Sequence, residues 1–272
     1  MSRSLARRAR WRFHWLIRPH ARFRVRHWFD GMTIELPHAG AAAQIYYRGF
    51  SSPGVAAVVC ALAPTVEVFV DVGAHAGEYS LLAARRSRGR ARVIAVEPQE
   101  SFAHLIAHNA RRNDVSVEVR REAVGDRVGT LSFATDAASG GAWLAPEKQQ
   151  GTVDTTVTTL DEILADTPAA SVLLKLDAAG HEAGALRGAE HLLADERLRA
   201  IVYKLYHPDV VRERADIDVD VIADMAGRGF NQWLWADGWR VVRCLADVMD
   251  ALNDRWYSAP VFASRRLTPP DS

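Results

Sequence analysis

A glycine-containing turn and two carboxylates follow apolar segments at a spacing that suits the binding of a charged cofactor. Asp71 lies in the segment VEVFVDV, which runs directly into GAHAG, so Gly73 and Gly77 occupy a predicted strand-to-helix turn. Glycines without β-carbons at such a turn let a ligand approach the backbone and the helix N-terminus. Glu97 ends the next segment, IAVEP, where an acid can accept hydrogen bonds from both hydroxyls of a ribose.

A third acid, Asp126 in AVGD, follows the next apolar segment and is predicted to reach an adenine amino group. For each acid alone a local role is the alternative, a turn residue at Asp126 or a helix cap at Glu97. Three acids after three consecutive strands favour a binding site, because the carboxyl ends of such strands meet at one crevice. His75 stands where a dinucleotide fingerprint has its second glycine, so a cofactor with a cationic amino-acid end suits Asp71 better than a pyrophosphate does.

Residues able to handle a proton gather in LLKLDAAGHEAGALRGAE, residues 173–190. Asp177 ends the predicted strand, and His181 and Glu182 open the next helix. Asp177 is the first candidate to orient a substrate or accept its proton, His181 the second, and His207, after the fifth strand, the third. The alternative for the histidines is an ordinary surface position, since the chain has ten of them.

Lys175 is a charge inside a predicted buried strand, so it must find a partner there. By strand alternation it shares a side with Asp177. We therefore expect Lys175 to take part in the same site.

From Pro64 onward, short apolar segments alternate with amphipathic ones, which predicts a parallel sheet covered by helices on both faces. The expected strands are 66–72, 92–98, 115–124, 171–177 and 200–207, and the expected helices are 77–87, 100–112, 158–166, 182–195 and 215–228. A turn at Asp237-Gly238 and the segment APVFASR predict an antiparallel closing element. The expected domains are an extension, 1–63, and an α/β domain, 64–272.

Composition excludes several classes of protein. The chain has 272 residues, 49% of them hydrophobic, and 34 basic against 33 acidic residues, so its overall charge does not favour nucleic acid. Its two cysteines have no metal-ligand or disulfide-framework spacing, which makes a reducing cytoplasm the expected location. No apolar run approaches the roughly 18 residues of a membrane-spanning helix.

The first 30 residues are rich in arginine and tryptophan. Trp11, Trp15 and the pair Leu16-Ile17 are spaced to lie on one side of a short helix that Pro19 ends. The arginines could hold an acidic substrate, a partner, a second copy of the chain or anionic lipid, but a solvated helix packed on the domain by its tryptophans is favoured. Further along, TIELP and AQIYYRG are predicted to form a hairpin or edge strand, with a short helix at 54–63.

The ordered blocks DVGAHAGEYSLLAA, VEPQESFAHLIAHNARRN, EAVGD, TTLDEIL and LLKLDAAGHEAGALRGAE resemble the FkbM family of S-adenosylmethionine-dependent methyltransferases. The resemblance covers about residues 64–207. It implies a class I methyltransferase (Rossmann-like) fold, with a mostly parallel seven-stranded sheet and an antiparallel last strand. It also implies O-methylation of a hydroxyl on a sugar or secondary metabolite, as in natural product biosynthesis.

By the same resemblance, Asp71, Gly73, His75 and Gly77 would lie at the methionine part of the cofactor and Glu97 at its ribose. Val124 and Asp126 would lie at its adenine.

The chain departs from the family pattern K-I-D-V-E-G-x-E at Ala179, and Lys204 replaces a glutamate common at the end of the fifth strand. Lys175, Asp177, Gly180 and Glu182 match. Losing two acids predicts a pocket without a metal, in which a lysine holds Asp177. The departures also keep an alternative open: a binding or regulatory protein that retains the cofactor pocket and has lost turnover. A dehydrogenase is disfavoured by His75.

Overall fold

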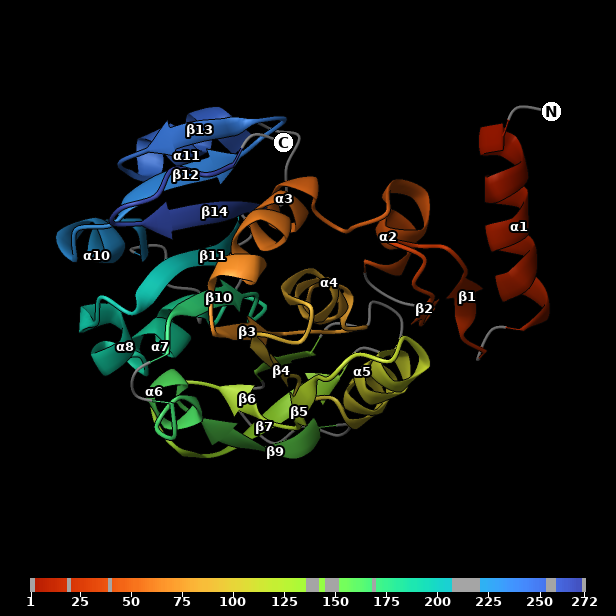
Figure 1. Cartoon of the computed structure of the whole chain (residues 1–272), viewed down its shortest axis with the longest axis horizontal. Coiled ribbons are helices and arrows are strands. Elements are labelled where there is room, and N and C mark those ends of the chain that lie inside the picture. Colours follow the sequence, from red (N-terminus) through yellow and green to blue (C-terminus); the bar gives the residue numbers. More distant parts are fainter. Residues whose placement is uncertain are drawn as a thin grey trace.

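The computed structural model describes residues 3–18, 21–38, 41–135, 142–144, 152–167, 170–206, 221–252 and 258–270. Figure 1 shows the arrangement of its elements. The helices are α1 (Arg3–Ile17), α2 (Ala42–Arg48), α3 (Pro53–Leu62), the short 3-10 helix η1 (Ala63–Thr65), α4 (Glu78–Ser87), α5 (Glu100–Arg112), α6 (Leu160–Ile163), α7 (Glu182–Arg187), α8 (Glu190–Ala194), α10 (Val221–Gly227) and α11 (Leu245–Leu252). The strands are β1 (Phe23–Val25), β2 (Ile34–Leu36), β3 (Val68–Val72), β4 (Arg92–Val96), β5 (Glu118–Arg120), β6 (Ala123–Val124), β7 (Gly129–Thr135), β8 (Ala142–Leu144), β9 (Thr152–Thr158), β10 (Val172–Leu176), β11 (Leu198–Tyr206), β12 (Asn231–Trp235), β13 (Trp239–Val242) and β14 (Ser258–Ser264).

The central sheet has the order β13-β12-β14-β11-β10-β3-β4-β5. Strands β11, β10, β3, β4 and β5 are parallel, and β14 lies antiparallel between β11 and β12. This confirms the expected class I methyltransferase arrangement, a mostly parallel sheet with an antiparallel end. The expected count of seven strands is wrong for the described residues, because the turn at Asp237-Gly238 adds β13 as an eighth strand at the edge.

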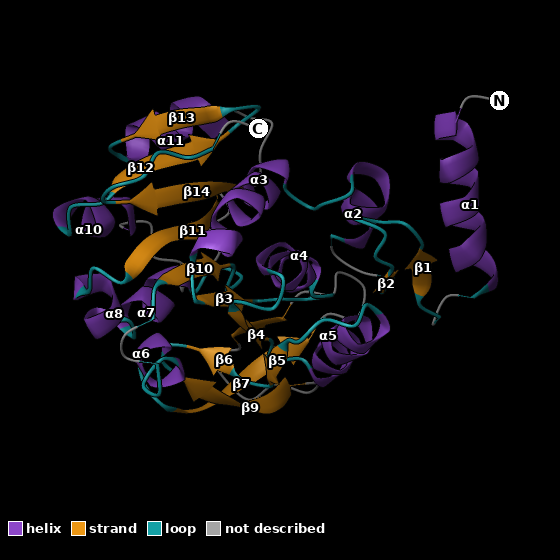
Figure 2. Ribbon diagram, viewed as in Figure 1, coloured by secondary structure: helices purple, strands orange, loops and turns teal. Residues whose placement is uncertain are grey.

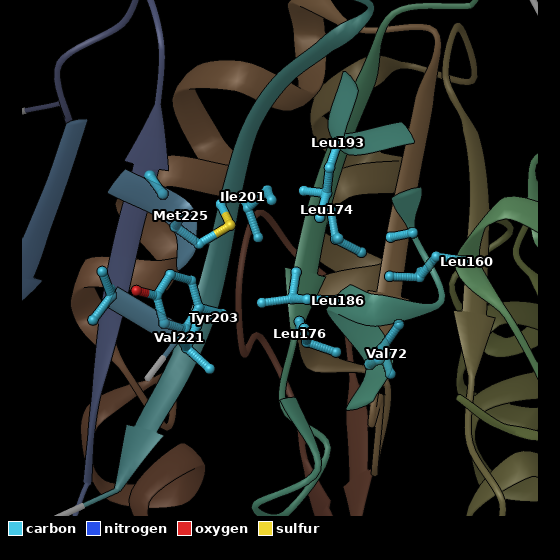
Figure 3. Close-up of a cluster of buried hydrophobic side chains, with 14 of the residues drawn as sticks. Val72, Leu160, Leu174, Leu176, Leu186, Leu193, Ile201, Tyr203, Val221 and Met225 are labelled. Atoms are coloured by element: carbon cyan, nitrogen blue, oxygen red, sulfur yellow. The ribbon is translucent and has the colours of Figure 1, made fainter. Parts of the chain in front are cut away.

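Helices cover both faces of this sheet, as Figure 2 shows. Alternate residues of a strand contact opposite layers, because side chains alternate across a sheet. In β3, Val70 faces a core that includes α6, α7, α8 and α10, whereas Phe69 faces α3 and α4. Figure 3 shows the first of these cores, where Leu174 and Leu176 of β10 lie near Leu186 and Leu193. The parallel part of the sheet is therefore buried on both sides, which favours the ends of its strands as the place for a ligand site.

A second sheet, of order β6-β9-β7-β8, adjoins the first. Its strands β7–β9 were not expected from the sequence. The segment 115–124, predicted as one strand, contributes β5 to the central sheet and β6 to the second one. Two predicted helices also differ: 158–166 is reduced to the single turn α6, and 182–195 is broken into α7 and α8, with Gly188 against the Gly125 carbonyl.

The N-terminal residues share a core with the α/β fold. Trp15, Phe23, Ile34 and Ile45 pack in one cluster with residues of α4 and α5, among them Leu81. TIELP contains the strand β2, but β2 pairs with β1, which was not predicted from the sequence. AQIYYRG forms helix α2, so the predicted hairpin between these two segments is wrong. The shared core has no break at residue 63. The division into an extension, 1–63, and an α/β domain, 64–272, therefore stays a proposal.

Trp11 and Trp15 pack α1 against the domain, in agreement with the interpretation favoured from the sequence. Trp15 is 6% exposed, and Trp11 stacks on Tyr46 with ring centroids 5.1 Å apart. Leu16 and Ile17 do not share this side, contrary to the prediction, and are 80% and 55% exposed.

Candidate active site

The turn between β3 and α4 has a left-handed backbone at three positions, Gly73 (φ 68°), His75 (φ 52°) and Gly77 (φ 82°). A β-carbon on Gly73 would overlap the carbonyl oxygen of Asp177, and one on Gly77 would press against Ile106 of α5. The glycines are therefore required by the backbone conformation and by protein contacts. The turn predicted from the sequence is confirmed. At Gly73 the group that approaches the backbone is the carbonyl of Asp177 in the β10–α7 loop, whereas we predicted a ligand there.

Asp71 lies beneath this turn and is fully buried. Lys175, its register partner on β10, approaches Asp71 Oδ1 at 3.0 Å, and the hydroxyl of Ser80 donates to Oδ2 at 2.6 Å. The Lys175 ammonium also donates to the carbonyls of Val72 and Gly73, each at 2.9 Å. An ammonium has three protons, so these contacts use all of them. The ion pair of Lys175 and Asp71 thus fixes the backbone at the start of the turn.

Burial opposes the charge on Lys175, but Asp71 and Asp177 outweigh it and raise the pKa of its ammonium above the ordinary range. Lys175 therefore stays charged, and its direct ion pair is with Asp71 rather than with Asp177 as the sequence suggested. In this position Lys175 and Asp71 act on the site through the turn that they support.

Glu97 follows β4 and is 4% exposed. One carboxylate oxygen accepts from the backbone N–H of His75 at 2.9 Å, and the other from that of Gln99 at 3.0 Å. Burial is the main cause that raises the Glu97 pKa to about 7. Each oxygen keeps a further lone pair, so the carboxylate can still accept hydrogen bonds from a diol.

The His75 ring lies against Phe102 of α5, with centroids 4.5 Å apart. Its Nε2 atom is buried without a hydrogen-bond partner in the described structure. Burial, followed by the charge of Lys175, lowers the His75 pKa to about 4, so the ring is neutral. A neutral ring nitrogen that has no protein partner is available to a ligand.

Asp177 follows β10 beside the glycine turn, and Lys204 of β11 reaches its Oδ2 at 3.2 Å. Burial raises the pKa of Asp177, but Lys204 and then Lys175 outweigh burial and lower it below the ordinary range. Asp177 is therefore ionised, and the charges of Lys204 and Lys175 both stabilise its carboxylate. The expectation that a lysine holds Asp177 agrees with this geometry.

The other residues of this loop hold its shape. Glu182 is 4% exposed and its Oε1 accepts from the N–H groups of Ala178 (2.8 Å) and Gly180 (3.3 Å), while burial raises its pKa to about 7. Ala179 has φ 54°, an unusual conformation for a residue with a β-carbon. His181 is half-buried at the N-cap of α7. These positions indicate a structural role for Glu182. His207 lies outside the described residues.

The predicted adenine residues lie on the second sheet. Val124 is a buried residue of β6, and Asp126 is exposed in the turn between β6 and β7. Asp126 therefore does not follow the third strand of the central sheet directly, as the sequence suggested, because β6 leaves that sheet. Its contact with adenine stays a prediction.

A further buried acid near the turn, Glu78, was not identified from the sequence. Its carboxylate accepts from the backbone N–H of Ser51 at 3.0 Å and from the Ser51 hydroxyl, and burial raises its pKa to about 7. Tyr79 contacts Ser51 and Ser52 through its hydroxyl. These bonds join the N-terminal residues to the start of α4. Ser52 is the N-cap of α3, before Pro53, but nothing local to Ser51 in the sequence indicates Glu78 as its partner.

Among the described residues, no cluster of three or more His, Cys, Asp or Glu side chains has the arrangement of a metal site. None of the described helices is long and apolar enough to cross a membrane.

A scan against protein-family models matched the methyltransferase FkbM domain over residues 71–230. The chain belongs to the FkbM methyltransferase family. The match begins at Asp71 and includes Glu97, Asp177 and Lys204, so the site lies wholly within the family domain. A comparison with curated proteins found no match.

Solved structures of methyltransferases align with this chain at low sequence identity. The methyltransferase FkbM from Methylobacillus flagellatus KT aligns with a TM-score of 0.46 at 18% identity, over 72% of this chain and 43% of that one. The O-methyltransferase from Bacillus cereus, in complex with SAH, aligns with a TM-score of 0.44 at 15% identity, over 78% and 81% of the two chains. Precorrin-6y C5,15-methyltransferase from Geobacter metallireducens GS-15 aligns with a TM-score of 0.43 at 12% identity, over 77% and 86%. This chain thus spans less than half the length of the Methylobacillus protein.

Replacing Glu97 with alanine is expected to weaken the binding of S-adenosylhomocysteine about a hundredfold, because two hydrogen bonds to a buried carboxylate are worth about 3 kcal/mol together. The parent protein should bind more tightly as the pH rises from 6 to 8. With a pKa of about 7, Glu97 must lose a proton before it accepts from a diol, so affinity falls on the acid side. Calorimetric titration measures both effects.

The matched control is Glu100→Ala. It removes an exposed acid that lies three positions after Glu97 and is paired with Arg121. It should leave the affinity and its pH dependence unchanged. Unchanged affinity in Glu97→Ala would refute the assignment of Glu97 to the ribose.

Proposed function

We propose that this FkbM-family protein is an S-adenosylmethionine-dependent O-methyltransferase that acts in the cytoplasm on a hydroxyl of a sugar or secondary metabolite. The observation that supports the proposal is that two acids lie beside the same glycine turn. Glu97 is buried and accepts from the backbone N–H of His75, and Asp177 is ionised with its carbonyl close to Gly73. We assign Glu97 to a cofactor diol and Asp177 to the acceptor.

The residues present fit this cofactor. The turn 73–77 presents the orphaned Nε2 of His75, and Glu97 keeps lone pairs for two hydroxyl donors. S-Adenosylmethionine supplies, when bound, a methyl group on a sulfonium. In the proposed site Glu97 holds the ribose, and the turn fixed by Lys175 lies at the methionine part.

Asp177 has the second role. An ionised carboxylate accepts a hydrogen bond from the acceptor hydroxyl, orients its oxygen and takes up its proton as the new bond forms. Lys204 contacts Oδ2 of Asp177 and helps to keep the carboxylate ionised. We propose that no metal takes part.

The acceptor class can be tested by measuring release of S-adenosylhomocysteine with pools of sugars, hydroxylated metabolites, amines and carboxylic acids. Turnover is expected only with hydroxyl-bearing pools. Turnover confined to amines or carboxylic acids would contradict O-methylation of a hydroxyl while leaving the family assignment intact.

A second candidate is a binding or regulatory protein that holds the cofactor without turnover. The ion pair between Lys204 and Asp177 favours it, because an acid committed to a lysine is a weaker base. The double reversion Ala179→Glu with Lys204→Glu distinguishes the two candidates. We expect turnover in the parent without magnesium; turnover only in the reversion, or only with magnesium, would favour an impaired parent or a metal-dependent reaction.

A further inference from the structure

Helix α1 presents an apolar stripe away from the domain. Phe13, Leu16 and Ile17 are 62%, 80% and 55% exposed. They lie three and four positions apart, so they are neighbours on one side of the helix. In the part of the chain that the structure describes, four of the seven exposed large hydrophobic residues belong to this helix.

The opposite side of α1 is fixed to the protein. Trp15 is buried, Trp11 contacts Phe23 and stacks on Tyr46, and the Arg7 guanidinium lies over the Tyr46 ring. Figure 1 shows α1 at the edge of the molecule, farthest from the strands of the central sheet. The apolar stripe is therefore held in an outward orientation and does not face the domain core.

Arginines flank the stripe on both sides. Arg12 lies one turn from Leu16, Arg8 lies one turn before Arg12, and Arg10 lies one turn before Phe13. All three are exposed. The first 29 residues contain nine arginines and no Asp or Glu, whereas the rest of the chain has 25 basic and 33 acidic residues. The N-terminal residues that carry the apolar stripe thus have a net positive charge, and Arg8 and Arg12 lie exposed beside the stripe.

We propose that the outward face of α1 binds the surface of an anionic phospholipid bilayer. A helix with large apolar side chains on one face and arginines beside them lies in the plane of the interface, with the apolar face among the acyl chains and the guanidinium groups at the headgroup phosphates. The charge pattern decides against two other occupants. Nucleic acid would use the arginines but leave the apolar stripe exposed, and a second α1 would bring two rows of arginines together.

This proposal is independent of the reaction at the sheet edge. It places the protein at a membrane surface.

Flotation of the full-length protein with vesicles tests the proposal. We expect binding to vesicles of phosphatidylcholine with phosphatidylglycerol and little binding to phosphatidylcholine alone. Phe13→Gln with Leu16→Gln should weaken binding at least about tenfold through lost apolar burial. Arg8→Gln with Arg12→Gln should weaken it about fivefold for each arginine, and only on the anionic vesicles.

The control variant Val128→Thr with Val241→Thr replaces two hydrophobic residues elsewhere that are also more than half exposed, so its binding should equal that of the parent. All variants replace exposed side chains, and circular dichroism should show unchanged melting. Three results would overturn the proposal: no binding by the parent, equal binding to both vesicle types, or a dimer in solution that the Phe13 and Leu16 substitutions dissociate.

Discussion

Replacing Lys175 with methionine is expected to destabilise the protein by about 3–5 kcal/mol, because it leaves the buried Asp71 carboxylate without its counter-ion. The carbonyls of Val72 and Gly73 lose their donor as well. Denaturant unfolding measures this change.

The control is Lys204→Met, which removes the other lysine of the site. Its pair with Asp177 is one-third exposed on each side, so the expected cost is no more than about 1 kcal/mol. Adding Asp71→Asn to Lys175→Met should recover part of the lost stability. Equal costs for the two lysines would show that Lys175 is not the buried support that we infer.

Replacing Asp177 with asparagine is expected to lower kcat/KM for methyl transfer by about a hundredfold to a thousandfold, since an amide orients a hydroxyl but cannot take up its proton. The affinity for S-adenosylhomocysteine should change little, because Glu97 and the glycine turn remain. The comparison of turnover with calorimetric affinity separates a reacting group from a cofactor ligand.

Asp224→Asn serves as the control for this variant. Asp224 is half exposed on α10, where it pairs with Arg228, and its loss should leave turnover unchanged. Full activity in Asp177→Asn would remove Asp177 from the reaction and leave His181 as the next candidate.

Local signals predicted that Asp71, Glu97 and Asp177 lie at one edge of the sheet, and their roles there stay predictions. Asp71 is the penultimate residue of β3, whereas Glu97 and Asp177 directly follow β4 and β10. The ends of parallel strands meet whatever the order of the strands. The partner of Lys175 depended on that order. The nearest acid along the chain is Asp177, but β10 lies beside β3 in a register that places Lys175 opposite Asp71. Nothing local to residue 175 reports this pairing.

Two wrong predictions of secondary structure have a different cause. The aromatic and β-branched residues of AQIYYRG favour a strand, but burial of Ile45 and Tyr46 against the N-terminal elements selects the helix α2. The second sheet has a weaker signal: in β9, the buried β-branched residues Thr155 and Val157 alternate with the exposed Asp154 and Thr156, as in a half-buried strand. The role of Gly73 was also hidden, because the carbonyl that it must accommodate lies about a hundred positions away along the chain.

The most direct test of the account is transfer of a labelled methyl group from S-adenosylmethionine to an extract of the host by the parent protein, with Glu97→Ala in parallel. We expect the parent to place the label on an acceptor in a linkage that resists mild alkali, as a methyl ether does and a methyl ester does not, and we expect Glu97→Ala to place almost none. Tight binding of the cofactor by the parent without any transfer of label would contradict the account and leave a binding protein on a methyltransferase fold.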